Sequence, residues 1–189
     1  MQLATTLETG RLRLRPLLRE DAANVQALVS DRAIADTTLN IPHPYPENGA
    51  MTWIIAQQLR CEAGELVNFA MVLKETERLI GVTGFISVNL RSQRAELGYW
   101  VGKPFWNHGY ATEAVQALLT YAFNTLNLHR VHGSVFKRNP ASRRVFEKNG
   151  MSFEGCWRSH EKKWDQYEDV LVYGILKGEW VEAQERRDA

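Results

Sequence analysis

A glycine turn that opens directly into an amphipathic helix is the part of this sequence best suited to hold a charged ligand. The turn lies in the run from Trp106 to Ala114, with Gly109 just before the helical pattern begins. The first N–H groups of a helix lack partners within the helix, and the helix dipole places partial positive charge behind them. Phosphate binds readily there, and glycine lets it approach the backbone closely. The run therefore predicts a pyrophosphate cradle for a nucleotide-type cofactor; an ordinary strand-to-helix connection is the alternative.

Two strands and two helices must position this turn. Residues 95–101 read as an apolar strand before it, and residues 130–135 read as a second strand further on. After the turn, apolar residues recur at helical spacing: Ala111, Ala114, Val115, Leu118, Leu119, Ala122, Phe123 and Leu126. Pro140 suits the first position of a helix and Gly150 is a typical helix stop, so we expect a second helix between them.

The rest of the chain also mixes strands and helices. Leu12 and Leu14 alternate with arginines, which is typical of a strand with one buried face. Helices are expected near 21–30 and 47–61, with a loop that contains three prolines over 40–46 between them. Further strands are expected over 69–73, 79–88, 152–164 and 167–176. The sequence shows no linker or internal repeat, so one domain over residues 1–189 is the simplest organisation.

These motifs, in this order, resemble the GNAT acetyltransferase superfamily, and within it the RimJ/RimL branch of ribosomal-protein N-terminal acetyltransferases. The motifs that carry the resemblance span nearly the whole chain: Thr9 to Pro16, Glu96 to Val101, Gly109 to Ala114, Asn139 to Ser142 and Asp169 to Leu176. Two places depart from the pattern. Trp106 stands where the superfamily usually has Gln or Arg, and Asn107 and His108 stand where the branch commonly has Gly and a basic residue.

The resemblance implies an α/β (α+β) fold. A mixed central β-sheet of about seven strands would be flanked by about four helices, and it would splay between its fourth and fifth strands. The pantetheine arm of acetyl-CoA would lie in that gap. The implied reaction is transfer of an acetyl group from acetyl-CoA to a primary amine, without a metal.

The resemblance also implies which residues bind the cofactor. Backbone groups of the strand would contact the thioester, the turn and first helical residues would hold the pyrophosphate, and the second helix start would reach the pantetheine. These residues are Trp100, Val101, Asn107, His108, Gly109, Tyr110, Ala111, Thr112, Asn139 and Ser142.

Two side chains are candidates for the chemistry. Glu96 resembles the strand carboxylate that accepts the amine proton in related enzymes, and its alternative is an ion pair with Arg94 or Arg91 on an exposed strand face. Ser142 resembles the serine placed near the CoA sulfur as a proton donor. Its alternative is an ordinary helix cap, a role for which Asn139 and Ser142 are both suited.

The acceptor is the part of the function that the sequence defines least. His43, Tyr45 and Trp164 lie on the segments that line the acceptor side in the family, although aromatics there also serve core or lid packing. An N-terminal α-amine, above all of a ribosomal protein, is the favoured acceptor. The alternatives are a small-molecule amine (an antibiotic, a polyamine or an amino acid), or a CoA-binding regulatory module without turnover.

Composition excludes several other classes. The 189 residues carry a formal net charge of +1, so neither a nucleic-acid surface nor a membrane surface is indicated. Cys61 and Cys156 are far apart and lack metal-ligand spacing, and His129 and His132 have no third ligand beside them. We therefore expect reduced thiols, no metal and a cytoplasmic protein. Homodimer formation through a sheet edge or the final strands stays open.

Overall fold

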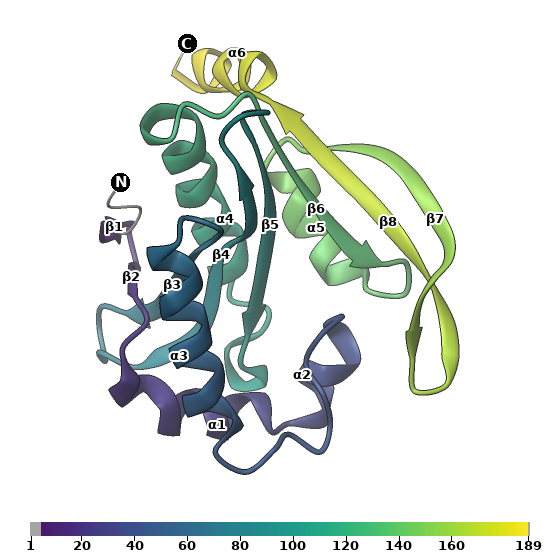
Figure 1. Cartoon of the computed structure of the whole chain (residues 1–189). Coiled ribbons are helices and arrows are strands. Elements are labelled where there is room, and N and C mark those ends of the chain that lie inside the picture. Colours follow the sequence, from purple (N-terminus) through teal and green to yellow (C-terminus); the bar gives the residue numbers. More distant parts are fainter. Residues whose placement is uncertain (1–4, 189) are drawn as a thin grey trace.

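The computed structural model describes residues 5–188, which form a mixed β-sheet with helices on both faces (Figure 1). The strand order across the sheet is β1-β2-β3-β4-β5-β6-β8-β7. The strands are β1 (Leu7–Glu8), β2 (Leu12–Pro16), β3 (Val67–Leu73), β4 (Leu79–Asn89), β5 (Arg94–Val101), β6 (Arg130–Phe136), β7 (Ser152–Lys163) and β8 (Gln166–Leu176). The helices are α1 (Ala22–Val29), α2 (Arg32–Thr37), α3 (Gly49–Glu62), α4 (Tyr110–Thr120), α5 (Pro140–Lys148) and α6 (Lys177–Asp188).

The expected α/β fold is confirmed, with three elements that the sequence did not predict. The eighth strand is β1, which has only two residues. α2 has six residues and begins after Asp31, whose side chain accepts a hydrogen bond from the N–H of Ala33. The last of the three is α6, which spans Lys177–Asp188 and is rich in charged residues. None of the helices in the described part of the chain is long and apolar enough to cross a membrane.

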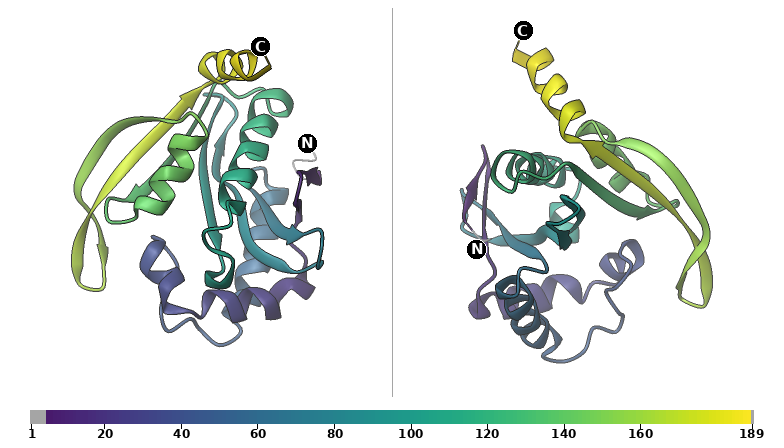
Figure 2. Two further views of the ribbon diagram at one scale, coloured as in Figure 1. Left: turned by 180° about the vertical axis from the view of Figure 1, so that it is seen from behind. Right: turned by 45° about the horizontal axis from the view of Figure 1, so that its top comes forward.

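Apolar clusters cover the two faces of the sheet. On one face, α4 and α5 pack through Leu118 and Phe146 against strand residues such as Leu97. On the other face, α1 and α3 pack through Val25 and Ile54. Figure 2 (left) shows α4 and α5 in front of the sheet, whereas α3 stands in front of it in Figure 1. The alternation of buried side chains along β5 assigns Leu97 and Tyr99 to the α4 face and Trp100 to the α3 face.

The sheet splits between β5 and β6. These two strands are parallel neighbours, and their pairing runs only from Arg94 opposite Arg130 to Leu97 opposite Gly133. Beyond that point the strands diverge, as Figure 1 shows. The predicted splay is therefore confirmed. It falls between the fifth and sixth strands here because β1 adds one strand at the start of the sheet.

A long hairpin formed by β7 and β8 extends past the end of the sheet (Figure 1). Trp164 and Asp165 occupy its turn with positive φ angles of 51° and 62°. β7 is the last strand in the sheet order, so one of its edges has no neighbouring strand within residues 5–188.

Candidate active site

The glycine turn has the backbone conformation that its sequence predicted. Gly109 is the residue before α4 and has φ +80°, in the left-handed region that glycine adopts without strain. Asn107 also has a positive φ, of 65°. A Cβ atom built on Gly109 would meet only one neighbour within 4 Å, Nη2 of Arg11 at 3.5 Å. The backbone in front of the helix is thus open to a ligand, as a pyrophosphate requires.

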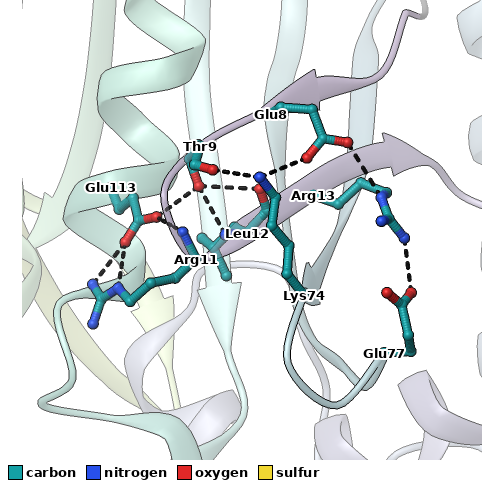
Figure 3. A network of polar contacts seen from close by, with 8 residues as sticks. All are labelled: Glu8, Thr9, Arg11, Leu12, Arg13, Lys74, Glu77 and Glu113. Atoms are coloured by element: carbon teal, nitrogen blue, oxygen red, sulfur yellow. Dashed lines mark hydrogen bonds and ion pairs between the residues drawn. The ribbon is translucent and has the colours of Figure 1, made fainter.

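Arg11 and Thr9 both bond to Glu113 beside this turn, and we call these three residues the Arg11 cluster (Figure 3). Arg11 lies between β1 and β2, and its Nη1 donates to the carbonyl oxygen of His108 at 2.9 Å. Its Nε donates to Oε2 of Glu113 at 2.7 Å, and its guanidinium carbon lies 4.6 Å from the ring centroid of Tyr110. No sequence pattern indicates this contact, because Arg11 and Glu113 are 102 residues apart.

Glu113 is ionised in this setting. Burial raises its pKa, but the hydrogen bonds from the Thr9 hydroxyl and from the backbone and side chain of Arg11 outweigh burial, so the pKa is lowered. The Thr9 hydroxyl donates at 2.6 Å and the Arg11 N–H at 2.8 Å. A positive guanidinium therefore lies beside a turn that has no lysine or arginine of its own.

Two cavities meet beside the split in the sheet. The smaller, of about 330 Å³, is lined by the turn, the start of α4 and α5. The larger, of about 740 Å³, lies between the split and α3 with the loop before it. The residues that line both are Thr37, Thr38, Tyr99, Trp100 and Ser142. Together the cavities form a path from the phosphate turn to the edge of β5, which fits a long, thin pantetheine arm.

Of the ten residues expected to bind the cofactor, nine line the smaller cavity. These are Trp100, Val101, Asn107, Gly109, Tyr110, Ala111, Thr112, Asn139 and Ser142. His108 is not among them. Its Nδ1 lies 2.7 Å from the carbonyl oxygen of Trp106 and its ring stacks on Tyr110, so its side chain contacts neighbouring residues of the same turn.

The strand backbone near Trp100 is regular. Trp100 and Val101 pair in register with Val82 and Gly81 of β4. The irregularity in this pair of strands lies on β4 between Phe85 and Ser87, opposite Leu97 and Glu96. Trp100 and Val101 line the smaller cavity beyond the point where the pairing with β6 ends.

Glu96 faces the larger cavity from β5. Its side chain is half-buried, and Oε1 accepts a hydrogen bond of 3.3 Å from the hydroxyl of Ser134. Within residues 5–188 it forms no ion pair with Arg94 or Arg91, so the alternative interpretation finds no support. Its neighbour across the β5–β6 pairing is His132. Burial lowers the pKa of His132, although the negative charge of Glu96 acts to raise it.

Ser142 lies in the first turn of α5, where Asn139 rather than Ser142 acts as the helix cap. The side-chain oxygen of Asn139 accepts the N–H of Ser142 at 3.1 Å. The Ser142 hydroxyl itself accepts a hydrogen bond of 2.9 Å from the phenol of Tyr99. Tyr99 is a residue that the sequence analysis did not single out. No spacing pattern could have found it, because its partner is 43 residues away on a different element.

On the acceptor side, the structure brings Tyr45 to the larger cavity, together with Trp53. His43 and Trp164 are not among the lining residues. They contact each other with ring centroids 6.4 Å apart, and the Trp164 indole N–H donates to Asp36 at 2.5 Å.

Lys163 also connects the β7–β8 hairpin to the loop before α3. Its ammonium donates to the carbonyl oxygens of Leu39 and Ile41, at 3.3 and 2.8 Å. His43 and Trp164 thus lie where the β7–β8 hairpin contacts the loop before α3.

No group of three His, Cys, Asp or Glu side chains gathers as metal ligands anywhere in the described residues. Cys61 and Cys156 are free cysteines.

A phosphate turn that leads into a split sheet, with a carboxylate and a hydroxyl beside the split, defines an acyltransferase that takes its acyl group from a coenzyme A thioester. The chain belongs to a known family of this class: residues 11–152 match the model of the acetyltransferase (GNAT) domain. The predicted membership is therefore confirmed, and the protein is an N-acetyltransferase that uses acetyl-CoA.

Individual relatives agree with this class. The chain is 33% identical to an uncharacterized N-acetyltransferase, p20, of Bacillus licheniformis, over 93% of this chain and 98% of that protein. It is 35% identical to the ribosomal-protein-serine acetyltransferase of Escherichia coli, over 56% of this chain and 59% of that protein. A crystal structure of spermidine N-acetyltransferase from Vibrio cholerae in complex with CoA and spermine has a similar fold. Its TM-score is 0.79 at 23% identity, over 90% of this chain and 98% of that one.

Proposed function

We propose that the acceptor of the acetyl group is the N-terminal α-amine of a protein, with ribosomal proteins as the first class to test. The observation that carries the proposal is the charge of the larger cavity. Its lining contains one half-buried carboxylate, Glu96, while Glu47 and Arg60 are exposed and opposite in sign. A polycationic acceptor is recognised best by several carboxylates, and this cavity does not offer them.

The ordinary pKa values of amines support the same acceptor. An α-amine with a pKa of about 7.8 is about one quarter neutral near pH 7.4, whereas a lysine amine with a pKa of about 10.4 is about one part in a thousand neutral. A single carboxylate is a sufficient base for the first and a weak one for the second. The size of the cavity and its aromatic lining, Tyr45, Trp53 and Trp100, suit the first residues of a peptide. The similarity to a ribosomal-protein-serine acetyltransferase points the same way.

In this proposal, two side chains assist the transfer. Glu96 takes the proton that the amine loses as its nitrogen bonds to the acetyl carbon, either directly or through a water molecule. Ser142 donates a hydrogen bond to the sulfur that departs as the carbon–sulfur bond breaks. The Arg11 cluster and the open backbone at Gly109 hold the pyrophosphate.

The test is acetyl transfer by the purified protein, followed as CoA release with intact-mass detection of the product. The acceptors are peptides with a free N-terminus, the same peptides blocked at the N-terminus but carrying lysine, spermidine, and an aminoglycoside. We expect one acetyl group on the free N-terminus and no reaction with the blocked peptides. Acetylation of spermidine or the aminoglycoside alone would overturn the proposed acceptor and favour a small-molecule amine.

A further inference from the structure

The hydroxyl oxygen of Ser142 accepts two hydrogen bonds from side chains, neither of which is needed to cap the helix. The phenol of Tyr99 donates to Ser142 Oγ at 2.9 Å, and the side-chain amide of Asn139 donates to the same oxygen at 3.4 Å. A serine hydroxyl can accept two hydrogen bonds and donate one. Because both acceptor positions are occupied, the hydrogen of Ser142 is left to be donated elsewhere.

Ser142 borders the space shared by the two cavities. Ser142 and Tyr99 both line the smaller cavity and the larger one. The same side-chain nitrogen of Asn139 also donates to the carbonyl oxygen of Thr37 at 3.4 Å. The arrangement leaves one unused donor, the Ser142 hydrogen, at the junction of the two cavities.

Tyr99 is well suited to a permanent donor role. Its ring packs edge-on against Phe146, with centroids 6.2 Å apart and planes at 88°. Burial raises its pKa to about 12. The phenol therefore keeps its proton throughout the range in which an enzyme works. A donor that never titrates fixes the direction of the next hydroxyl in the chain, and each hydrogen bond in such a chain strengthens the next.

We propose that Tyr99 is a positioning residue for the leaving group: by donating to Ser142 Oγ, it directs the Ser142 hydrogen to the departing CoA sulfur. This inference rests on the proposed role of Ser142. The amine nitrogen bonds to the acetyl carbon, the carbon–sulfur bond breaks, and its electron pair leaves on sulfur as a thiolate. The amine proton passes to Glu96 or water. Ser142 and Tyr99 keep their protons and contribute hydrogen bonds only, and the sulfur takes its proton from solvent.

The first test is kinetic and uses Tyr99→Phe, which keeps the ring that packs on Phe146 and removes only the hydroxyl. We expect kcat to fall about fivefold with the KM for acetyl-CoA unchanged, because about one neutral hydrogen bond is lost. Tyr173→Phe is the matched control. Its hydroxyl bonds to Glu147 and lines neither cavity, so its turnover should equal that of the parent. In a Ser142→Ala background, Tyr99→Phe should cause no further loss.

The second test needs no acceptor, so it separates this inference from the proposed function. The pKa of the CoA thiol bound to the protein is measured from the ultraviolet absorbance of the thiolate. Tyr99→Phe and Ser142→Ala should each raise that pKa, and the double variant should match Ser142→Ala. The inference is overturned if Tyr99→Phe leaves the thiol pKa unchanged, or if it slows turnover by the same factor with and without the Ser142 hydroxyl. Thermal melting of each variant checks that the fold is kept.

Discussion

Replacing Arg11 by Ala tests how the phosphate turn is held. The change removes the hydrogen bond from Nη1 to the His108 carbonyl at 2.9 Å and the contacts from Nε and Nη2 to Glu113 at 2.7 Å. Glu113 then keeps only its bonds from Thr9 and from the backbone N–H of residue 11. A carboxylate in the first turn of α4 would be left without its counter-charge beside the turn that we propose holds the pyrophosphate.

The expected magnitude follows from these contacts. The bond to the His108 carbonyl is worth about 1 kcal/mol. The ion pair adds at most about 1 kcal/mol, because the Arg11 side chain is 51% exposed and solvent screens it. If the whole of about 2 kcal/mol serves to order the turn, the Kd for CoA rises about thirtyfold. The free energy of unfolding should fall by no more than the same amount.

The assay is calorimetric titration with CoA, with Arg13→Ala as the matched control. Arg13 pairs with Glu8 and Glu77 on the same terminal segment and has no contact with the turn (Figure 3). We expect the Kd of the control to stay within about twofold of the parent, in line with the small worth of exposed ion pairs. Equal losses in both variants, or an unchanged Kd in Arg11→Ala, would refute the role given to the Arg11 cluster.

Three further predictions concern single positions. Gly109→Ala should raise the Kd for CoA about tenfold, because a side chain at φ +80° costs about 1–2 kcal/mol. The control, Gly155→Ala, should leave the Kd unchanged, since a Cβ atom there meets nothing within 4 Å. Equal affinities in the two variants would show that the turn does not bind the phosphates. Glu96→Gln should slow turnover most at low pH, where the amine is most protonated, and a rate equal to the parent across the pH range would exclude Glu96 as the base. The lowered pKa of Glu113 stabilises the fold fully above its ordinary value of 4.5, and this stabilisation is lost as pH falls through the lower folded value. Denaturation of Glu113→Gln in acid should therefore depend less on pH than that of the parent, and parallel pH curves would contradict this.

The sequence predicted those parts of the molecule that local pattern determines. The alternation at Leu12 and Leu14 marks β2, and both side chains are fully buried. The apolar spacing after Gly109 marks α4, which begins at Tyr110. Hydrophobic period and special backbone angles act over a few residues, so one sequence suffices to read them.

Contacts between segments far apart in the sequence could not be predicted from local patterns. Arg11 meets Glu113 and Tyr99 meets Ser142 only because the sheet order places these elements side by side. α2 was missed because six residues are too few for a helical period to appear. The short β1 was missed for the same reason.

The aromatics on the acceptor side show a second limit. His43 and Trp164 were expected at the acceptor, and the structure uses them where the hairpin meets the loop before α3. Residue type alone does not separate an aromatic that lines a cavity from one that anchors a loop. Of the three aromatics expected at the acceptor, Tyr45 is the one that lines the larger cavity.

The alternation of β5 explains how one short strand can serve both halves of the reaction. Side chains that are an odd number of residues apart point to opposite faces of a sheet. Tyr99 belongs to the α4 face, where it meets Ser142 of α5, and Glu96 lies with Trp100 on the α3 face, where the larger cavity opens. The pairing with β6 ends at Leu97, between these two residues, so the gap in the sheet opens where the strand passes from one role to the other. An amine held on the α3 face could then add to one face of the thioester carbonyl while the sulfur stays on the α5 side, so each group is held close to the acetyl carbon in a fixed orientation.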